Sequence, residues 1–130
     1  MPRIQKLLEG KTRWEIVRAS SALSADATLN FKTHDDTDGV LIHVKVENVS
    51  SFSVTPKLVT TTASGVTLTL WTASAAITAN GSKVYSISET DSSDFSGLTE
   101  SVQGTMPREW GLLLDHSAGT ADVLVEICYV

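Results

Sequence analysis

The chain has 130 residues, of which 42% are hydrophobic and 19% are charged, and its formal net charge at pH 7 is −5. This length suits one domain with a sizeable core, and the acidic balance argues against a nucleic-acid partner, whose phosphates must be neutralised. No apolar run approaches the roughly 20 residues of a membrane-spanning helix, and the N-terminus lacks the apolar segment of a secretory signal. We therefore expect a protein made in the cytoplasm, with no membrane partner.

Residues 1–20 are expected to form an N-terminal arm and a first strand. Pro2 and Gly10 bracket apolar residues at helical spacing, which predicts a short helix that needs a partner surface to be stable. Residues 1–18 carry five basic and two acidic side chains, a net +3, which leaves −8 for the other 112 residues. A basic arm on an acidic body is typical of docking onto another molecule. Packing of the arm on its own domain is the alternative.

Residues 21–130 are expected to form a single β domain. After a short strand at 27–32, alternating apolar residues predict a strand at 40–49, a turn at 48–51 and a further strand at 52–58. A turn at 63–65 precedes a strand with Trp71 on its outward face, and another strand follows at 83–89. The residues expected to point inward are Val40, Ile42, Val44, Val46, Phe52, Val54, Leu58, Val66, Leu68 and Leu70.

The last stretch contains two apolar-rich runs, at 109–116 and 121–130, which flank the break Ser117-Ala118-Gly119-Thr120. This pattern predicts a β-hairpin with a four-residue loop. Short strands separated by Gly, Asn and Asp turns predict an all-β fold, an antiparallel β-sandwich or jelly-roll-like barrel of about seven or eight strands.

The acidic turn at 34–39 is the one candidate for a metal site in the sequence. A calcium loop needs oxygen ligands at alternate positions, a Gly at the sixth and a bidentate Glu at the twelfth. Counting from His34 places Asp36, Asp38 and Gly39 correctly, but puts a histidine first and Lys45 last. We therefore expect no bound metal and interpret the stretch as a solvated turn.

Residues 90–105 predict a long surface loop pinned by Phe95, Leu98 and Val102. Its carboxylates, such as Glu100, have no His or Lys beside them, so we expect a contact loop rather than a catalytic one. Cys128 is the one cysteine and is expected to be a small buried hydrophobe. No phosphate loop, Cys/His cluster or Ser-His-Asp set is present, so neither an enzyme nor a cofactor is predicted.

Several segments together resemble small structural proteins of tailed bacteriophages. These segments are 62–65, 69–71, 74–81 and 84–85, followed by Pro107-Arg108-Glu109-Trp110, an apolar strand ending in His116, and a closing strand with Tyr129. The resemblance covers about residues 40–130. The family pattern has a basic residue shortly after the Trp, where this chain has Gly111-Leu112.

The resemblance implies a virion protein, a decoration (cement) protein that binds the outside of the assembled head. Its implied partners are the major capsid protein and further copies of itself, with a trimer favoured because multivalent attachment raises avidity. The residues expected to make capsid or subunit contacts are Arg3, Ile4, Lys6, Leu7, Leu8, Lys11, Arg13 and Phe95.

Two alternatives remain open at this point. A different virion role, in the tail or the head–tail junction, fits the same resemblance. A carbohydrate-binding β-sandwich would use exposed aromatic side chains as stacking platforms, for which Trp71, Tyr85 and Trp110 are the candidates. A hydrolase is the least favoured, since the chain carries no catalytic pattern.

Overall fold

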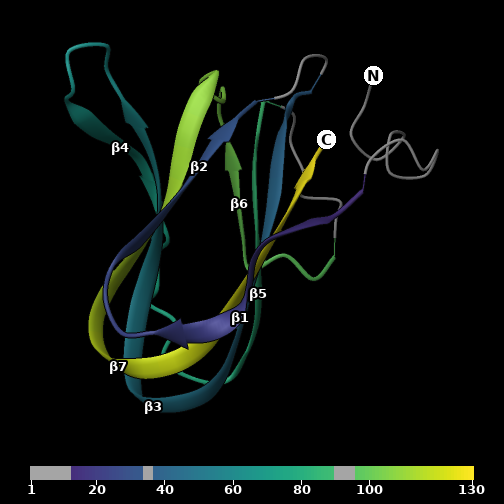
Figure 1. Ribbon diagram of the computed structural model, residues 1–130. Coiled ribbons are helices and arrows are strands. Elements are labelled where there is room, and N and C mark those ends of the chain that lie inside the picture. The colour runs from purple at the N-terminus through teal and green to yellow at the C-terminus, as the bar shows by residue number, and fades with distance from the viewer. Residues whose placement is uncertain (1–12, 34–36, 90–95) are drawn as a thin grey trace.

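A computed structural model describes residues 13–33, 37–89 and 96–130. The predicted all-β fold is confirmed: the described residues form one mixed seven-stranded sheet and no helix (Figure 1). The helix expected at residues 2–10 lies outside the described residues. The strands are β1 (Glu15–Leu23), β2 (Ala27–Lys32), β3 (Gly39–Thr61), β4 (Thr67–Thr72), β5 (Gly81–Ser88), β6 (Glu100–Gln103) and β7 (Glu109–Tyr129).

The two longest strands, β3 and β7, form a central antiparallel ribbon that bends back on itself. Their register runs from Val40 opposite Tyr129 to Val59 opposite Gly111, with shifts between Glu47 and Val54. At these shifts the ribbon turns a corner, seen at the bottom of Figure 1. The hairpin predicted between 109–116 and 121–130 is therefore wrong, because each run pairs with β3 instead of with the other run.

Backbone conformation explains why the sequence predicts turns at residues 48–51 and 117–120. Asn48, Ser51 and Gly119 have positive φ angles of 54°, 48° and 64°, a conformation typical of Gly and Asn in turns. Here these residues bend continuous strands at β-bulges, which add local twist and change strand direction. The expected turn at 48–51 is likewise a corner within β3.

The bend divides the sheet into two layers. One layer contains β1, the second half of β7, the first half of β3, β5 and β6; the other contains β2, the first half of β7, the end of β3 and β4. The prediction of a purely antiparallel sheet is wrong in one respect, because β5 and β6 run parallel. β6 also lies within the stretch 90–105 that was expected to be a loop.

The hydrophobic core lies between the two layers. The alternation predicted for residues 40–46 is confirmed, because every second side chain there is fully buried. Core residues from the first layer include Val40, Ile42, Val44, Val123 and Val125, and those from the second include Val54, Leu58, Trp110, Leu112 and Leu114. Within the described ranges there is no helix that is long and apolar enough to cross a membrane.

Candidate interaction surfaces

Of the eight residues predicted to make contacts, the structure describes Arg13. It is exposed and lies two residues before β1. Arg3, Ile4, Lys6, Leu7, Leu8, Lys11 and Phe95 lie outside the described residues, so their predicted roles stay predictions.

Arg13 belongs to an exposed group of residues at the start of β1. Trp14 and Ile16 are 42% and 62% exposed. The Trp14 and His43 rings pack edge to face, with their centroids 6.4 Å apart. Ile16 lies opposite Glu126 on the outer face of the first layer. We call Arg13, Trp14 and Ile16 the β1 patch. In this patch a basic side chain from the end of the arm is followed directly by exposed apolar side chains.

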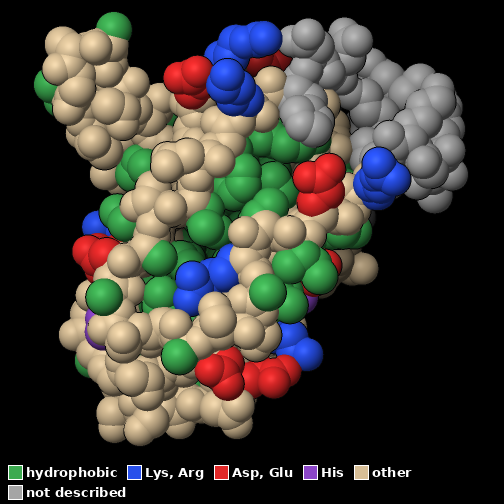
Figure 2. Space-filling view, viewed as in Figure 1, with side chains coloured by type: hydrophobic (Ala, Val, Ile, Leu, Met, Phe, Trp, Pro, Cys, Tyr) green, Lys and Arg blue, Asp and Glu red, His purple; other side chains and the backbone are tan. Residues whose placement is uncertain are grey.

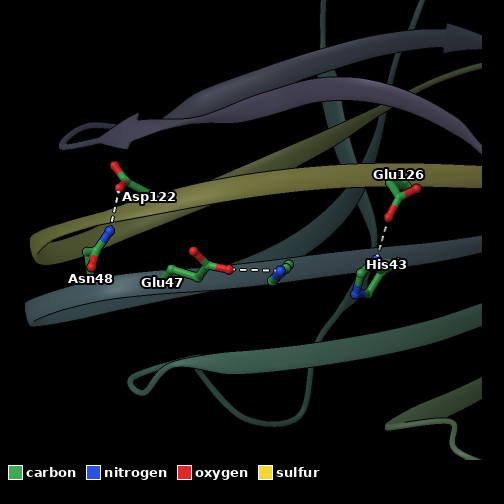
Figure 3. A network of polar contacts seen from close by, with 6 residues as sticks. His43, Glu47, Asn48, Asp122 and Glu126 are labelled. Atoms are coloured by element: carbon green, nitrogen blue, oxygen red, sulfur yellow. Dashed lines mark hydrogen bonds and ion pairs between the residues drawn. The ribbon is translucent and has the colours of Figure 1, made fainter.

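A line of polar pairs runs along the same outer face; two of the pairs connect β3 with β7 and the third lies within β3 (Figure 3). His43 Nδ1 lies 2.9 Å from Glu126 Oε1, and Asn48 Nδ2 donates to Asp122 Oδ2 at 2.9 Å. Lys45 Nζ lies 2.8 Å from Glu47 Oε1, and this hydrogen bond raises the pKa of Lys45. These partly exposed pairs keep the face polar, in contrast to the β1 patch at its end.

The second exposed apolar surface is the β3–β4 hairpin, residues 59–72, which projects away from β7 (Figure 1). Its loop is well hydrogen-bonded: Thr62 N–H donates to Val66 O at 2.8 Å, and Val66 N–H donates to Thr62 Oγ1 at 3.0 Å. Gly65 supplies the positive φ, 96°, that closes the loop. The hairpin therefore presents its side chains from a fixed backbone.

The prediction for the faces of β4 is wrong. Val66, Leu68 and Leu70 were expected to point inward but are 55%, 46% and 48% exposed, whereas Trp71, expected outward, is buried. The pairing shifts by one residue between Leu58 opposite Trp71 and Val59 opposite Thr69, which leaves Leu70 as the extra residue of a bulge. The extra residue brings Trp71 opposite Leu58 and into the core, whereas Leu68 lies opposite Thr60 in the projecting part of the hairpin and stays exposed.

The hairpin also lies in a stretch without charge. Residues 58–82 contain no Asp, Glu, Lys or Arg, in a chain that is 19% charged. Of the seven strands described, β4 alone has no charged residue. In Figure 2 the projecting lobe at the upper left accordingly shows neither red nor blue side chains. This signal is present in the sequence, but alternation of apolar and polar residues does not reveal it.

A cleft of about 420 Å³ lies where the hairpin separates from β2 and β7. The last β3–β7 pair is Val59 opposite Gly111, beyond which Thr60 Oγ1 donates to Glu109 O at 2.8 Å. Four threonines contribute hydroxyl groups to the lining. Gly111 also lines the cleft, and an added Cβ there would lie only 3.1 Å from Asn30 Oδ1 and 3.2 Å from Val59 Cγ2. Trp110 borders the cleft but is buried, so it offers no exposed ring.

The three aromatic residues considered as sugar platforms belong to the core. Trp71 Nε1 donates to Glu100 Oε2 at 2.7 Å, and Trp110 Nε1 donates to the Tyr129 hydroxyl at 3.2 Å. Tyr85 is buried against Trp71, with ring centroids 5.2 Å apart, and burial raises its pKa to about 12. None of the three therefore presents the exposed face that stacking on a sugar requires.

Glu100 has a structural role that sequence reasoning missed. It accepts hydrogen bonds from Trp71 and from both the backbone N–H and the Oγ of Ser74, the latter two at 2.9 Å. Burial raises the pKa of Glu100, but these hydrogen bonds outweigh it and leave the pKa below its usual value. The carboxylate thus ties β6 to the segment after β4.

The other candidates for chemistry lie apart from one another or outside the described residues. Cys128 is buried in a small cluster with Leu41 and Val130. Asp91 and Asp94, two further carboxylates of the stretch 90–105, lie outside the described ranges, as do residues 34–36 of the acidic turn. Among the residues that are described, no three His, Cys, Asp or Glu side chains gather as metal ligands would.

Among the residues that the structure describes, the two exposed apolar surfaces are the features typical of contact with other molecules. Comparison with protein-family models, with curated proteins and with solved structures finds no match for this chain.

Proposed function

We propose that this chain is a non-enzymatic virion structural protein, a decoration protein that binds the outside of a tailed-phage head and stabilises it. The proposal starts from the resemblance described above. The structural observation that supports it is the β1 patch, in which Trp14 and Ile16 are exposed directly after the basic arm. Exposed large apolar side chains beside basic residues are typical of a protein-binding surface.

The size of the β1 patch sets the strength expected of one contact. Full burial of an Ile side chain contributes about 1.5–3 kcal/mol, so the patch and arm of one copy give a weak attachment. Several linked copies bind far more tightly than one, because later contacts form at high effective concentration. A trimer placed on a local threefold axis of the head would use this effect.

The decisive measurement is the copy number of this chain per major capsid protein in gradient-purified particles. A ratio near one to one is expected for decoration of the whole shell. About a dozen copies or fewer would instead assign the chain to the portal or tail, where cyclic rings set the number. Complete absence from particles would overturn the virion proposal.

Binding of purified chain to undecorated heads tests the contact itself. Removal of residues 1–12, or the substitutions Trp14→Ala and Ile16→Ser, should each lower capsid occupancy. Arg13→Glu should also weaken binding, whereas the matched charge change Lys83→Glu, on the exposed start of β5, should leave occupancy unchanged. Full occupancy by the truncated chain would show that the arm is not the contact.

A further inference from the structure

We propose that β4 is a self-association edge, through which two copies of this chain pair antiparallel about a twofold axis. In this arrangement Leu68 faces the partner's Leu68. The inference does not depend on the virion proposal, because it concerns the purified chain in solution.

The outer edge of β4 is open within the part of the chain that the structure describes, where β4 pairs with β3 alone. The Thr62 N–H to Val66 O bond fixes the alternation of the β3–β4 ladder. Since hydrogen-bonded and non-hydrogen-bonded pairs alternate in antiparallel sheets, Leu68 directs its backbone groups toward β3. Thr67 and Thr69 therefore direct their N–H and C=O groups outward.

These outward groups define one favourable register. Pairing Thr67 with the partner's Thr69, and Thr69 with the partner's Thr67, forms two hydrogen-bonded pairs. Leu68 then lies opposite the partner's Leu68 in a non-hydrogen-bonded pair, where side chains approach most closely. Val66 lies opposite the partner's Leu70. The three exposed large apolar residues of the hairpin thus meet the same set of three residues of the partner.

The sequence of the strand fits this symmetric pairing. Val66-Thr67-Leu68-Thr69-Leu70 gives the same order of apolar and Thr residues in both directions. Antiparallel self-pairing consequently places apolar residues on apolar residues on one face and Thr on Thr on the other. The bulge at Leu70 lies toward Trp71 and leaves 66–69 in regular register with β3.

The other outer strands carry the charges that usually protect an exposed edge. β1 contains Glu15 and Arg18, β2 contains Lys32 and β6 contains Glu100. Exposed edges without charge, Pro or cover are the ones that pair with another chain. β4 has neither charge nor Pro, and its exposed side chains are apolar or hydroxyl-bearing.

The absence of charged residues around β4 also indicates which kind of partner fits this edge. A basic or acidic partner would find no complementary charge on residues 58–82, whereas a second β4 supplies the matching uncharged pattern and matching backbone groups. One pair of short strands buries less area than a stable standard interface, so the dimer should be weak. Alignment of copies on a larger assembly would strengthen it.

Sedimentation velocity of the full chain tests the proposal. Between about 1 and about 500 μM, the range in which small interfaces associate, the average mass should rise from 13.9 kDa toward twice that value. Leu68→Lys and Leu68→Glu should each keep the chain monomeric, because like charges would face each other across the axis. An equimolar mixture of the two variants should restore the dimer. Ser20→Lys, which places the charge at an exposed position of β1 outside the β1 patch, should leave association unchanged.

Cross-linking tests the register independently. Leu68→Cys should form a covalent dimer under mild oxidation, because directly opposed residues in a non-hydrogen-bonded pair lie within disulfide range. The native Cys128 is buried and does not compete. Ile16→Cys, although more exposed, should cross-link far less.

Three results would overturn the proposal. The first is a chain that stays monomeric throughout, with Leu68→Cys cross-linking no more than Ile16→Cys. The second is an assembly that persists in Leu68→Lys, since it would use another face. The third is failure of the Lys and Glu variants to associate when mixed, which would exclude the twofold register. None of these results bears on the copy number in particles, so the two proposals can fail separately.

Discussion

Gly119 lies directly against Ser50 at the corner of the β3–β7 ribbon. A Cβ on Gly119 would overlap the carbonyl oxygens of Ser50 and Ser51, and its φ of 64° lies in the left-handed region. The corner on β7 thus fits against the corner on β3 only because the residue at this point has no side chain. Both layers of the fold depend on this contact.

Gly119→Ala should therefore destabilise the protein by about 2–4 kcal/mol, from the left-handed conformation and the overlap together. Gly97→Ala is the matched control, because Gly97 also has positive φ, 85°, but has nothing within 4 Å of an added Cβ. It should cost about 1 kcal/mol. Urea unfolding of both variants separates the two effects; equal losses would show that the corner tolerates a side chain.

The corner also marks the limit of what the sequence could predict about the fold. Alternation correctly identified Val40, Ile42, Val44 and Val46 as core, because burial of every second residue needs only local information. The same turn signals, Asn48 and Gly119, fit either a hairpin or a bend in a long strand. Which one forms depends on the pairing of β7 with β3, whose paired residues lie between 52 (Val59 and Gly111) and 89 (Val40 and Tyr129) positions apart, and alternation carries no information on that.

The burial of Trp71 and the exposure of Leu68 give a second prediction. Trp71→Ala should destabilise the protein by about 3–5 kcal/mol, because it removes a buried ring that packs on Tyr85. Leu68→Ser should change stability by no more than about 0.5 kcal/mol, since Leu68 is exposed. Thermal unfolding of the two variants tests this; the opposite order would restore the assignment made from the sequence.

The interaction surfaces could be predicted only in part. The arm's charge pointed to Arg13, which the structure places beside exposed Trp14 and Ile16. The hairpin was missed because its apolar residues alternate as core residues do. The bulge at Leu70 and the projection of the hairpin beyond the core are tertiary features. The absence of charged residues in 58–82 is the one local feature of the sequence that indicates an unusual surface at the hairpin.

Glu100 provides a prediction with a defined pH dependence. Its folded-state pKa lies below the usual value because hydrogen bonds from Ser74 and Trp71 outweigh the effect of burial. A lowered pKa means that the carboxylate stabilises the fold above the unfolded pKa, and that this contribution is lost as pH falls through the folded pKa. Glu100→Gln should cost about 1 kcal/mol at pH 7, because the carboxylate is partly exposed and hydrogen bonds to charged groups contribute modestly.

Urea unfolding at a series of pH values measures this contribution. The difference in unfolding free energy between the native chain and Glu100→Gln should shrink as the pH falls from neutral to below the folded pKa of Glu100. Glu89→Gln, on an exposed residue just after β5, serves as the control and should change stability by no more than about 0.5 kcal/mol. A difference that stays constant with pH would mean that ionisation of Glu100 does not stabilise the fold.

Tyr85 should titrate well above an ordinary tyrosine. Burial, aided by the negative charge of Glu100, raises its pKa from 10.0 to about 12. A raised pKa keeps the phenol neutral in the folded state, so its contribution to stability is present below pH 10 and is lost as pH rises toward 12. Ultraviolet titration of tyrosinate should show a late component that Tyr85→Phe removes, while the Tyr129 component persists. If Tyr85→Phe instead removes a component near pH 10, the ring is accessible to solvent and the packing against Trp71 is looser than the structure indicates.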